Sequence, residues 1–396
     1  MLQPPLSRSR IRRLAVRVGV AAASAALFVG IVEASVRILA SAGAIDAPPL
    51  GAADDFWNSD HPTFGVWHAP EQATRHSSDC FDVLYQTNSV GARDRERTER
   101  SDAPRVVVLG DSFVEGWGLA TEERLSDQLE QRTELEHLNF GMSHFSPYQA
   151  VLAYRELGLR FAHDAVLLAV VPASDFADLD VRRAMRMPTY DYRYRPYLVG
   201  EYPDFEEIHL REQVLARWLR RNSFGYNALS GISAALRERV RASNRNAAGV
   251  GATRMVARAT DDARSDRGAS AEPEPTHSFF HDYSPRLLDL LRSSIERLKA
   301  AAGGRSVAVA LVPQMRDLVR YDESGTSPLG SELGELLAPF DVRVVDLLPE
   351  LYRRRSDLTR YFLTCEIHWS GEANEVASEA IAEMLADSFY ARRPVR

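Results

Sequence analysis

Apolar residues recur along this chain in short runs and in longer amphipathic stretches. The short runs are Val106–Leu109, Ala165–Val170, Ser306–Val312 and Val342–Leu347. Runs of this length are typical of strands buried in a parallel sheet. The amphipathic stretches at residues 121–132, 285–302 and 371–386 predict helices. Strands alternating with helices predict an α/β domain with three layers and a mainly parallel sheet.

The first apolar stretch follows a cluster of arginines. The arginines are Arg8, Arg10, Arg12, Arg13 and Arg17. The stretch runs from Val18 to Val32 and continues past Glu33 and Arg37 to Ala40. Its uninterrupted core is shorter than the roughly 20 residues that span a bilayer, but flanking arginines that snorkel extend it. Residues 1–42 are therefore expected to be a cytoplasmic basic tail with an uncleaved, single-pass membrane anchor. The rest of the chain is then extracytoplasmic, that is, periplasmic or extracellular. A signal peptide cleaved at Ala40-Ser41-Ala42 is the alternative.

Composition divides the remainder of the chain. Residues 43–103 are rich in Pro, Gly, Asp, His and Trp, and are expected to form an extended segment packed on a larger domain at 104–390. Within that domain, residues 176–244 are long enough for an insertion that caps a cleft. Residues 245–276 contain almost no large apolar side chains, which predicts a disordered loop.

Two motifs allow both a structural and a functional interpretation. Asn88 and Arg93 either fix a turn or line the cleft, and the turn is the favoured interpretation. The alternating Tyr and Arg residues of Tyr190–Tyr197 fit an edge strand with one buried aromatic face. They fit equally well a surface that stacks on sugars or holds an anionic polymer.

Composition and charge exclude several classes of function. The 396 residues are 45% hydrophobic and carry a net charge of −7, which suits one large globular domain with additions. The sequence has no extended basic face, no phosphate-binding glycine loop and no Cys/His spacing of the zinc type. We therefore expect no nucleic acid, nucleotide, metal or other cofactor as a partner.

A serine stands directly after the first predicted strand, in Gly110-Asp111-Ser112-Phe113. Ligands of open α/β sheets bind beyond the carboxyl ends of the strands, so Ser112 is expected at the reactive edge. Its backbone N–H, at a strand-to-helix turn, is a first candidate donor to an oxyanion. The alternative is that Asp111 and Ser112 only cap a turn.

Four blocks in the same order resemble the SGNH (GDSL-type) hydrolase family, in particular membrane-anchored bacterial glycan O-acetyl esterases and acetyltransferases. The blocks are Val106–Gly118 (VVVLGDSFVEGWG), Leu138–Gln149, Ala165–Asp175 and Glu366–Ser370. The resemblance extends over about residues 105–385. It implies a flavodoxin-like α/β/α fold with a five-stranded sheet.

The resemblance also implies the roles of individual residues. Ser112 is the nucleophile, His368 is the general base, and Glu366, two residues before the histidine, orients the imidazole. A lone histidine with a purely structural role is the alternative for His368. A family aspartate is replaced by Glu366, which keeps the negative charge.

The oxyanion hole departs further from the family pattern. Its expected donors are the backbone N–H groups of Ser112 and His144 and the Ser174 hydroxyl, with Gly141 as an alternative for the second donor. His144 stands where the family has glycine, and Ser174 stands where it has asparagine. Losing one such donor typically slows acyl transfer by about 10²–10³-fold. The resemblance places five further residues in the substrate site: Asp111, Asn139, Gly141, Asp175 and Trp369.

The expected function is therefore that of a serine esterase acting on O-acyl groups, acetyl above all, of an envelope glycan or a similar substrate. An acyltransferase built on the same machinery, or a non-catalytic glycan-binding or assembly protein, is the alternative. Cys80 and Cys365 are the only cysteines. In an extracytoplasmic protein an even count favours a disulfide, here to the histidine loop, over two buried thiols.

Overall fold

The computed structural model describes residues 8–44, 56–57, 59–186, 190–211, 218–219, 222–227, 277–354 and 357–386. The chain divides into two compact units. One contains Met1–Ala53 and Gln213–Thr260, and the other contains Asp54–Glu212 and Asp261–Arg396. The loop 245–276, for which disorder is predicted, lies outside the described residues.

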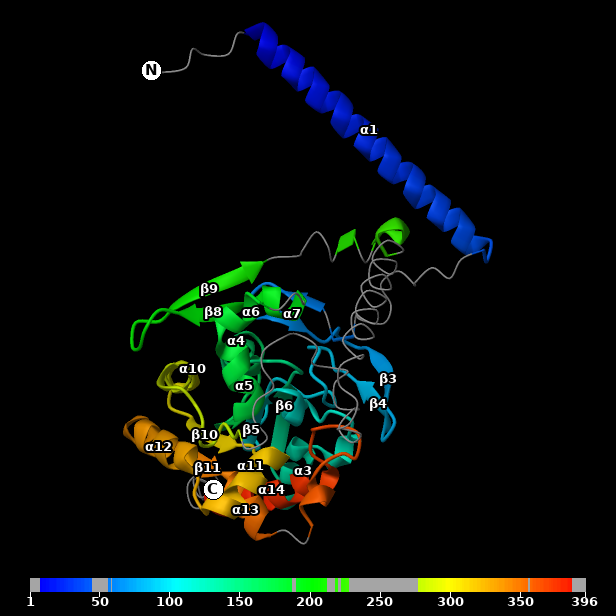
Figure 1. The fold of residues 1–396 in the computed structure, drawn as a ribbon. Coiled ribbons are helices and arrows are strands. Elements are labelled where there is room, and N and C mark those ends of the chain that lie inside the picture. Colours follow the sequence, from blue (N-terminus) through cyan, green and yellow to red (C-terminus); the bar gives the residue numbers. More distant parts are fainter. Residues whose placement is uncertain are drawn as a thin grey trace, which may run out of the picture. The chain divides into compact units, whose positions relative to one another are not determined.

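The second unit is built on a parallel sheet of five strands (Figure 1). The strands are β5 (Arg105–Gly110), β6 (Glu136–Gly141), β7 (Ala165–Val170), β10 (Ser306–Leu311) and β11 (Val342–Asp346). They lie in the order β6-β5-β7-β10-β11, and every pair is parallel. Numbered along the chain this is the order 2-1-3-4-5 of a flavodoxin-like sheet. The predicted fold class is confirmed.

Helices cover both faces of this sheet and bury β5, β7 and most of β10. On one face α3 (Leu125–Thr133) packs on α14 (Gly371–Leu385), which also contacts α13 (Leu347–Arg353). On the other face α10 (Pro285–Ala302) packs against three helices, in the arrangement that right-handed crossovers produce. These helices are α4 (Pro147–Glu156), α5 (Pro172–Leu179) and α12 (Pro328–Leu337).

Short helical elements complete this unit. They are α2 (Ser112–Glu115), η1 (Thr121–Glu123), η2 (Gly158–Arg160), α6 (Val181–Ala184), α7 (Tyr190–Arg193), α11 (Met315–Ser324), η3 (Ala338–Phe340) and η4 (Leu358–Tyr361). The helix predicted over 121–132 is interrupted, because Arg124 has an extended backbone between η1 and α3. The start of α10 is explained by the residues at that position. Ser284 accepts a hydrogen bond from the Leu287 N–H at the start of α10, and Pro285 occupies its first turn.

The segment before the sheet forms two small hairpins. Their strands are β1 (Ser59–His61) with β2 (Gly65–Trp67), and β3 (Ala73–Ser77) with β4 (Asp82–Gln86). Phe64 and Trp67 belong to the same hydrophobic core as the sheet. The Asn88 carboxamide accepts hydrogen bonds from the N–H groups of Val90 and Ala92, which fixes a turn.

A third hairpin follows α7. Strands β8 (Tyr194–Val199) and β9 (Glu206–Arg211) pair antiparallel. Tyr192, Arg195 and Tyr197 are buried, and the Arg195 guanidinium lies 4.4 Å from the centroid of the Tyr192 ring. The predicted edge strand is therefore only partly correct, because Tyr190–Arg193 is the helix α7 and the buried side of β8 carries both Arg195 and Tyr197.

The first unit contains α1 (Arg8–Ser41). Its portion Val16–Ser41, with a mean hydropathy of 1.8, is long and apolar enough to cross a membrane. Signal sequences also meet this criterion. Glu33, inside this portion, accepts hydrogen bonds from the Ser223 hydroxyl at 2.7 Å and from the N–H groups of Phe224 at 2.9 Å and Gly225 at 2.8 Å. The two charges that interrupt the apolar run also pair with each other, because Arg37 donates to Glu33 at 2.8 Å.

Candidate active site

The turn after β5 presents Ser112 at the carboxyl edge of the sheet. The chain turns at Gly110, where an added Cβ would lie 2.5 Å from Val114 Cγ2. The Asp111 carboxylate accepts a hydrogen bond from the Phe113 N–H at 2.9 Å and caps α2, whose first residue is Ser112. This turn lies where strand order reverses between β5 and β7, which is where such sheets bind ligands.

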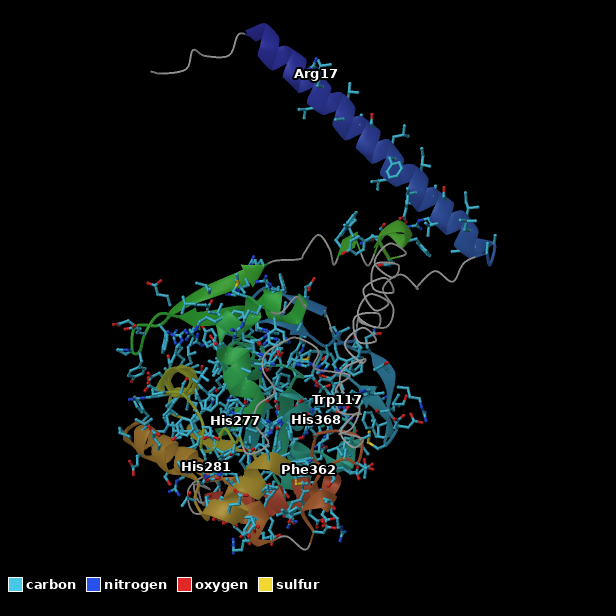
Figure 2. All side chains as sticks on the ribbon, in the orientation of Figure 1. Arg17, Trp117, His277, His281, Phe362 and His368 are labelled. Atoms are coloured by element: carbon cyan, nitrogen blue, oxygen red, sulfur yellow. A yellow bond between two sulfur atoms is a disulfide. The ribbon has the colours of Figure 1, made fainter. Side chains whose placement is uncertain are left out.

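The structure brings Ser112 and His368 together, although 256 positions separate them. Ser112 Oγ lies 2.9 Å from His368 Nε2, within hydrogen-bond distance. The Trp117 ring stacks on the imidazole, with centroids 5.5 Å apart and an interplanar angle of 26°. Figure 2 labels both residues. A nucleophile and a base in this contact are the first requirement of acyl transfer through a serine.

Glu366 lies beside the other nitrogen of the imidazole. Its Oε2 is 3.7 Å from His368 Nδ1, which is longer than a hydrogen bond. The neighbouring imidazole lowers the pKa of Glu366, which keeps the carboxylate charged. A small rotation of either side chain would allow the carboxylate to accept a hydrogen bond from Nδ1–H.

These residues line a cavity of about 270 Å³. The other lining residues come from the turn after β5, from the loop after β6, from α5 to α7 and from the start of α11. They are Asp111, Phe113, Trp117, Ser143, His144, Ala173, Ser174, Asp178, Arg183, Tyr192, Gln314, Arg316 and Ile367. The cavity therefore gathers residues from the carboxyl ends of four neighbouring strands.

Two of the residues expected to supply oxyanion donors, Ser112 and His144, line this cavity. Neither the Ser112 N–H nor the His144 N–H donates a hydrogen bond to any described residue. His144 has a φ of +63°, the left-handed region that favours glycine and is less strained for a residue without a β-branch. The Ser174 hydroxyl, by contrast, donates to Asp111 Oδ2 at 3.0 Å, so its proton is directed away from an oxyanion.

Glu115 connects the nucleophile turn to the loop that carries His144. It is fully buried, and its Oε2 accepts hydrogen bonds from the Ser143 N–H at 2.7 Å and from the Ser143 hydroxyl. Its Oε1 accepts from Trp57 Nε1 at 2.8 Å and lies 3.2 Å from His68 Nε2. Burial disfavours the charged form, but His68 and Ser143 prevail and lower the pKa of Glu115 to about 2.

Arg93 stabilises the same turn through hydrogen bonds to its backbone. Its buried guanidinium donates hydrogen bonds to the carbonyl oxygens of Glu115 at 2.7 Å and Leu119 at 2.6 Å. The ring of Tyr85 lies 3.4 Å from the guanidinium carbon. Asn88 and Arg93 therefore hold turns rather than line the cavity.

Three carboxyl groups surround the turn and lie mostly out of solvent. Burial raises the pKa of Asp111 to about 6, and it also raises the pKa of Asp175 and of Asp178. Asp175 accepts a hydrogen bond from the Val171 N–H at 2.6 Å. Asp178 lies 3.9 Å from Arg195.

Four residues expected to contact substrate lie outside the cavity lining. Asn139 and Gly141 are buried on β6 against α2, where the Asn139 amide donates to the Val114 carbonyl oxygen at 2.7 Å. Asp175 is engaged as described above, and the buried Trp369 donates to the Pro313 carbonyl oxygen at 3.0 Å. The structure thus places all four in the support of the site, and only Asp111 of the five lines the cavity.

Several cavity residues were not singled out from the sequence. Trp117 lies within the first block, and Gln314 and Arg316 directly follow β10. The rule that ligands bind beyond the carboxyl ends of strands would have identified Gln314 and Arg316. Tyr192 belongs to the alternating Tyr and Arg motif of the predicted cap, for which a surface that contacts substrate is one of the two interpretations, whereas no sequence pattern distinguishes Arg183.

A disulfide attaches the histidine loop to the hairpin of β3 and β4. Cys80 and Cys365 are bonded, with Cα atoms 5.6 Å apart, and no described cysteine is free. The predicted pairing is confirmed. Because Cys365 directly precedes Glu366, the bond restricts the loop that carries both Glu366 and His368.

Replacing both cysteines by serine should lower the free energy of unfolding by about 3–5 kcal/mol, because the bond restricts a long loop in the unfolded chain. Any activity that depends on His368 should fall before the fold is lost. Chemical unfolding and activity assays with and without reductant measure the two effects. The double-serine variant itself should not respond to reductant. Full activity in the reduced, folded chain would show that the bond does not position the loop.

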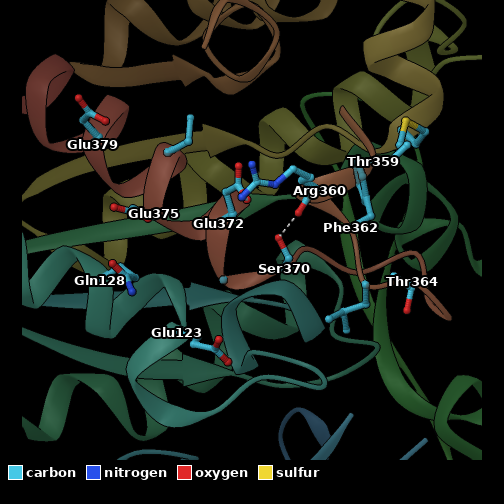
Figure 3. Close-up of a pocket in the computed structure, with 14 residues that line it drawn as sticks. Glu123, Gln128, Thr359, Arg360, Phe362, Thr364, Ser370, Glu372, Glu375 and Glu379 are labelled. Atoms are coloured by element: carbon cyan, nitrogen blue, oxygen red, sulfur yellow. Dashed lines mark hydrogen bonds and ion pairs between the residues drawn. The ribbon is translucent and has the colours of Figure 1, made fainter. Parts of the chain in front are cut away.

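A second hollow lies on the other side of the histidine loop, with a volume of about 1220 Å³ (Figure 3). Four of its lining residues are glutamates: Glu123, Glu372, Glu375 and Glu379. Ser370, which donates to the Arg360 carbonyl oxygen at 2.6 Å, closes the loop at this side. The hollow is larger than the cavity at Ser112 but contains neither Ser112 nor His368.

Among the described residues, no group of three or more His, Cys, Asp or Glu could hold a metal ion.

No family model and no curated protein matches this chain. Among solved structures, a member of the lipolytic protein G-D-S-L family from Veillonella parvula is 11% identical, with a TM-score of 0.36 over 72% of this chain and 99% of that chain. A lipase/acylhydrolase from Enterococcus faecalis is 10% identical, with a TM-score of 0.36 over 72% and 96%. A Clostridium thermocellum family 3 carbohydrate esterase is 11% identical, with a TM-score of 0.35 over 73% and 98%.

At this level of similarity, what the chain does must be inferred from its own residues. The fold and the site define an α/β protein with a serine and a histidine in contact at the switch point of a flavodoxin-like parallel sheet.

Proposed function

We propose that this chain is a serine esterase of the SGNH type. The observation that carries the proposal is the 2.9 Å contact between Ser112 Oγ and His368 Nε2. It is supported by Ser112 and His144, which line the same cavity and whose N–H groups donate to no described residue. Backbone donors of this kind stabilise the negative charge that develops on an acyl oxygen.

The reaction proceeds in two halves. Ser112 Oγ attacks the ester carbonyl carbon while its proton passes to His368 Nε2, and the acyl oxygen becomes an oxyanion beside the N–H groups of Ser112 and His144. The carbon–oxygen bond to the alcohol then breaks, and His368 gives its proton to the departing alkoxide. In the second half, water attacks the acyl group, gives a proton to His368, and releases the acid as Ser112 recovers its proton. Glu366 stabilises the imidazolium in both halves.

The substrate class that we favour is an acetyl ester of an envelope glycan or of a similar alcohol. A cavity of about 270 Å³ suits a small acyl group. The apolar helix Val16–Ser41 and the arginines before it support a membrane-anchored chain whose site is extracytoplasmic. Transfer of the acyl group to a second alcohol would use the same residues.

One observation favours a non-catalytic binding protein. The Ser174 hydroxyl donates to Asp111 instead of pointing toward the position of an oxyanion, so one expected donor is engaged. The contact between nucleophile and base argues for catalysis, because a binding site has no need of it.

Incubating the full chain in detergent micelles with a fluorophosphonate probe tests the proposal. We expect covalent labelling of Ser112, located by mass spectrometry, together with release of acetate from 4-nitrophenyl acetate. A folded chain that neither reacts with the probe nor cleaves the ester would instead be a binding protein.

A further inference from the structure

The cavity at Ser112 contains an arginine without an ion pair to any described residue. Arg316 lines the cavity from the first turn of α11 and is half-buried. Its charge acts on the neighbouring Asp317, but the Asp317 carboxylate already accepts hydrogen bonds from the Ser278 hydroxyl at 2.7 Å and from the Gln314 N–H at 2.8 Å. A guanidinium at the wall of a small cavity that forms no hydrogen bond with a described residue is available to a ligand.

The other charges of the cavity are accounted for within the protein. Asp111 accepts hydrogen bonds from Phe113 and Ser174, and Glu366 faces His368. Asp178 lies near Arg195, and the charges of Arg183 and His144 act on it as well. Arg316 is therefore the charged group of the lining that is left to act on a substrate.

Arg316 also lies on a defined side of the cavity. The indole of Trp369, the residue after His368, donates to the Pro313 carbonyl oxygen, so the start of α11 is attached to the histidine loop. Ser174, Arg183 and Tyr192 come from α5 to α7, on separate elements. In acyl transfer the base gives its proton to the departing alcohol, so the alcohol portion lies against His368. Arg316 is thus placed to contact the alcohol portion.

We propose that Arg316 selects esters whose alcohol portion carries a negatively charged group, a carboxylate above all. A guanidinium binds a carboxylate through two parallel hydrogen bonds, and the partly water-excluded wall strengthens this interaction. This inference rests on the proposed esterase function and deepens it, because it assigns the charge of the substrate.

Two isosteric pairs of esters provide the test: 3- and 4-acetoxybenzoate, and the corresponding acetoxybenzamides. In each pair the alcohol portion differs only in charge, and the two isomers hold the carboxylate at different distances from the ester. For the full chain in detergent micelles, we expect kcat/KM for one benzoate to exceed that for its benzamide. In Arg316→Gln this ratio should fall about tenfold, the scale of a charge-assisted hydrogen bond. The comparison of ratios removes any difference in intrinsic reactivity between the esters.

Two variants serve as controls. Arg316→Lys keeps the charge and should retain part of the preference. Arg320→Gln removes a cation from the same helix. Because Arg320 pairs with Glu323 and does not line the cavity, this variant should leave the ratio of kcat/KM between benzoate and benzamide unchanged. An equal ratio in the wild-type chain and in Arg316→Gln would overturn the inference.

A binding measurement separates this inference from the esterase proposal. Calorimetry with 3- and 4-hydroxybenzoate, the products, on the Ser112→Ala chain requires no turnover. One product should bind about tenfold more weakly when Arg316→Gln is added. Equal affinities with and without Arg316→Gln would overturn the anion site even if the chain cleaves esters. A loss of affinity in a chain that cleaves no ester would refute only the proposed esterase function.

Discussion

Replacing Ser112 or His368 by alanine should abolish ester cleavage, with kcat/KM falling by at least about 10³-fold, while the domain stays folded. Each residue acts in one relay, through the contact between Ser112 Oγ and His368 Nε2. Neither side chain belongs to the hydrophobic core. Steady-state kinetics and circular dichroism of the full-length variants measure the two properties.

The pattern among the variants matters as much as the size of the loss. The double variant Ser112→Ala/His368→Ala should be no slower than either single variant, because the residues act as a unit. Glu366→Gln should be milder, about 10²-fold or less, since its carboxylate stands 3.7 Å from His368 Nδ1. Full turnover of a folded Ser112→Ala chain would remove Ser112 as the nucleophile.

Glu115→Ala should lower the free energy of unfolding by about 3–5 kcal/mol, the cost of breaking a buried charged network. The variant leaves His68, Trp57 and the Ser143 N–H without their buried partner. Glu115→Gln keeps a hydrogen-bond acceptor and should cost less, about 1–3 kcal/mol. Because Ser143 precedes His144, both variants should also lower kcat more than they raise KM. Urea unfolding and steady-state kinetics provide the measurements.

The same network predicts a dependence on pH. The pKa of Glu115 in the folded chain is about 2, below its ordinary value of 4.5. The contribution of the carboxylate is therefore complete above pH 4.5 and is lost as the pH falls toward 2. The difference in unfolding free energy between the wild-type chain and Glu115→Gln should narrow over this interval.

Glu99→Gln is the matched control for Glu115. It removes an exposed ion pair, in which Glu99 lies 2.7 Å from Arg160 and both side chains are about half exposed. Exposed pairs contribute about 0–1 kcal/mol, so the free energy of unfolding should hardly change. If Glu115→Gln behaved like this control in stability and in kcat, the network would not hold the His144 loop.

Local sequence patterns were sufficient for the elements and for the frame of the site. Helix α10 begins and ends where the amphipathic pattern predicts. Strands β5, β7 and β10 were predictable because an apolar run bounded by turn residues has few alternatives to a buried strand. The meeting of Ser112 and His368 was expected only from the family resemblance that the four blocks carry, and the structure brings the two side chains into contact.

Local sequence patterns do not predict which residues hold the site residues in place. Trp57 and His68 reach Glu115 through tertiary packing of the segment before the sheet, and no spacing in the sequence relates them. Asn139 shows a related difficulty. A motif identifies the residue, but the side of the strand that it occupies decides whether it meets substrate or, as here, the backbone of α2. Arginine is a common surface residue, and only the structure shows that Arg316 lines the cavity without an ion pair to a described residue.

The contacts of Glu33 join two segments that are far apart in the chain. Glu33 accepts three hydrogen bonds from Ser223, Phe224 and Gly225, about 190 positions along the chain. The first helix and residues 222–227 therefore belong to one compact unit. A chain that lacked residues 1–42 would leave the donors of residues 223–225 without their carboxylate.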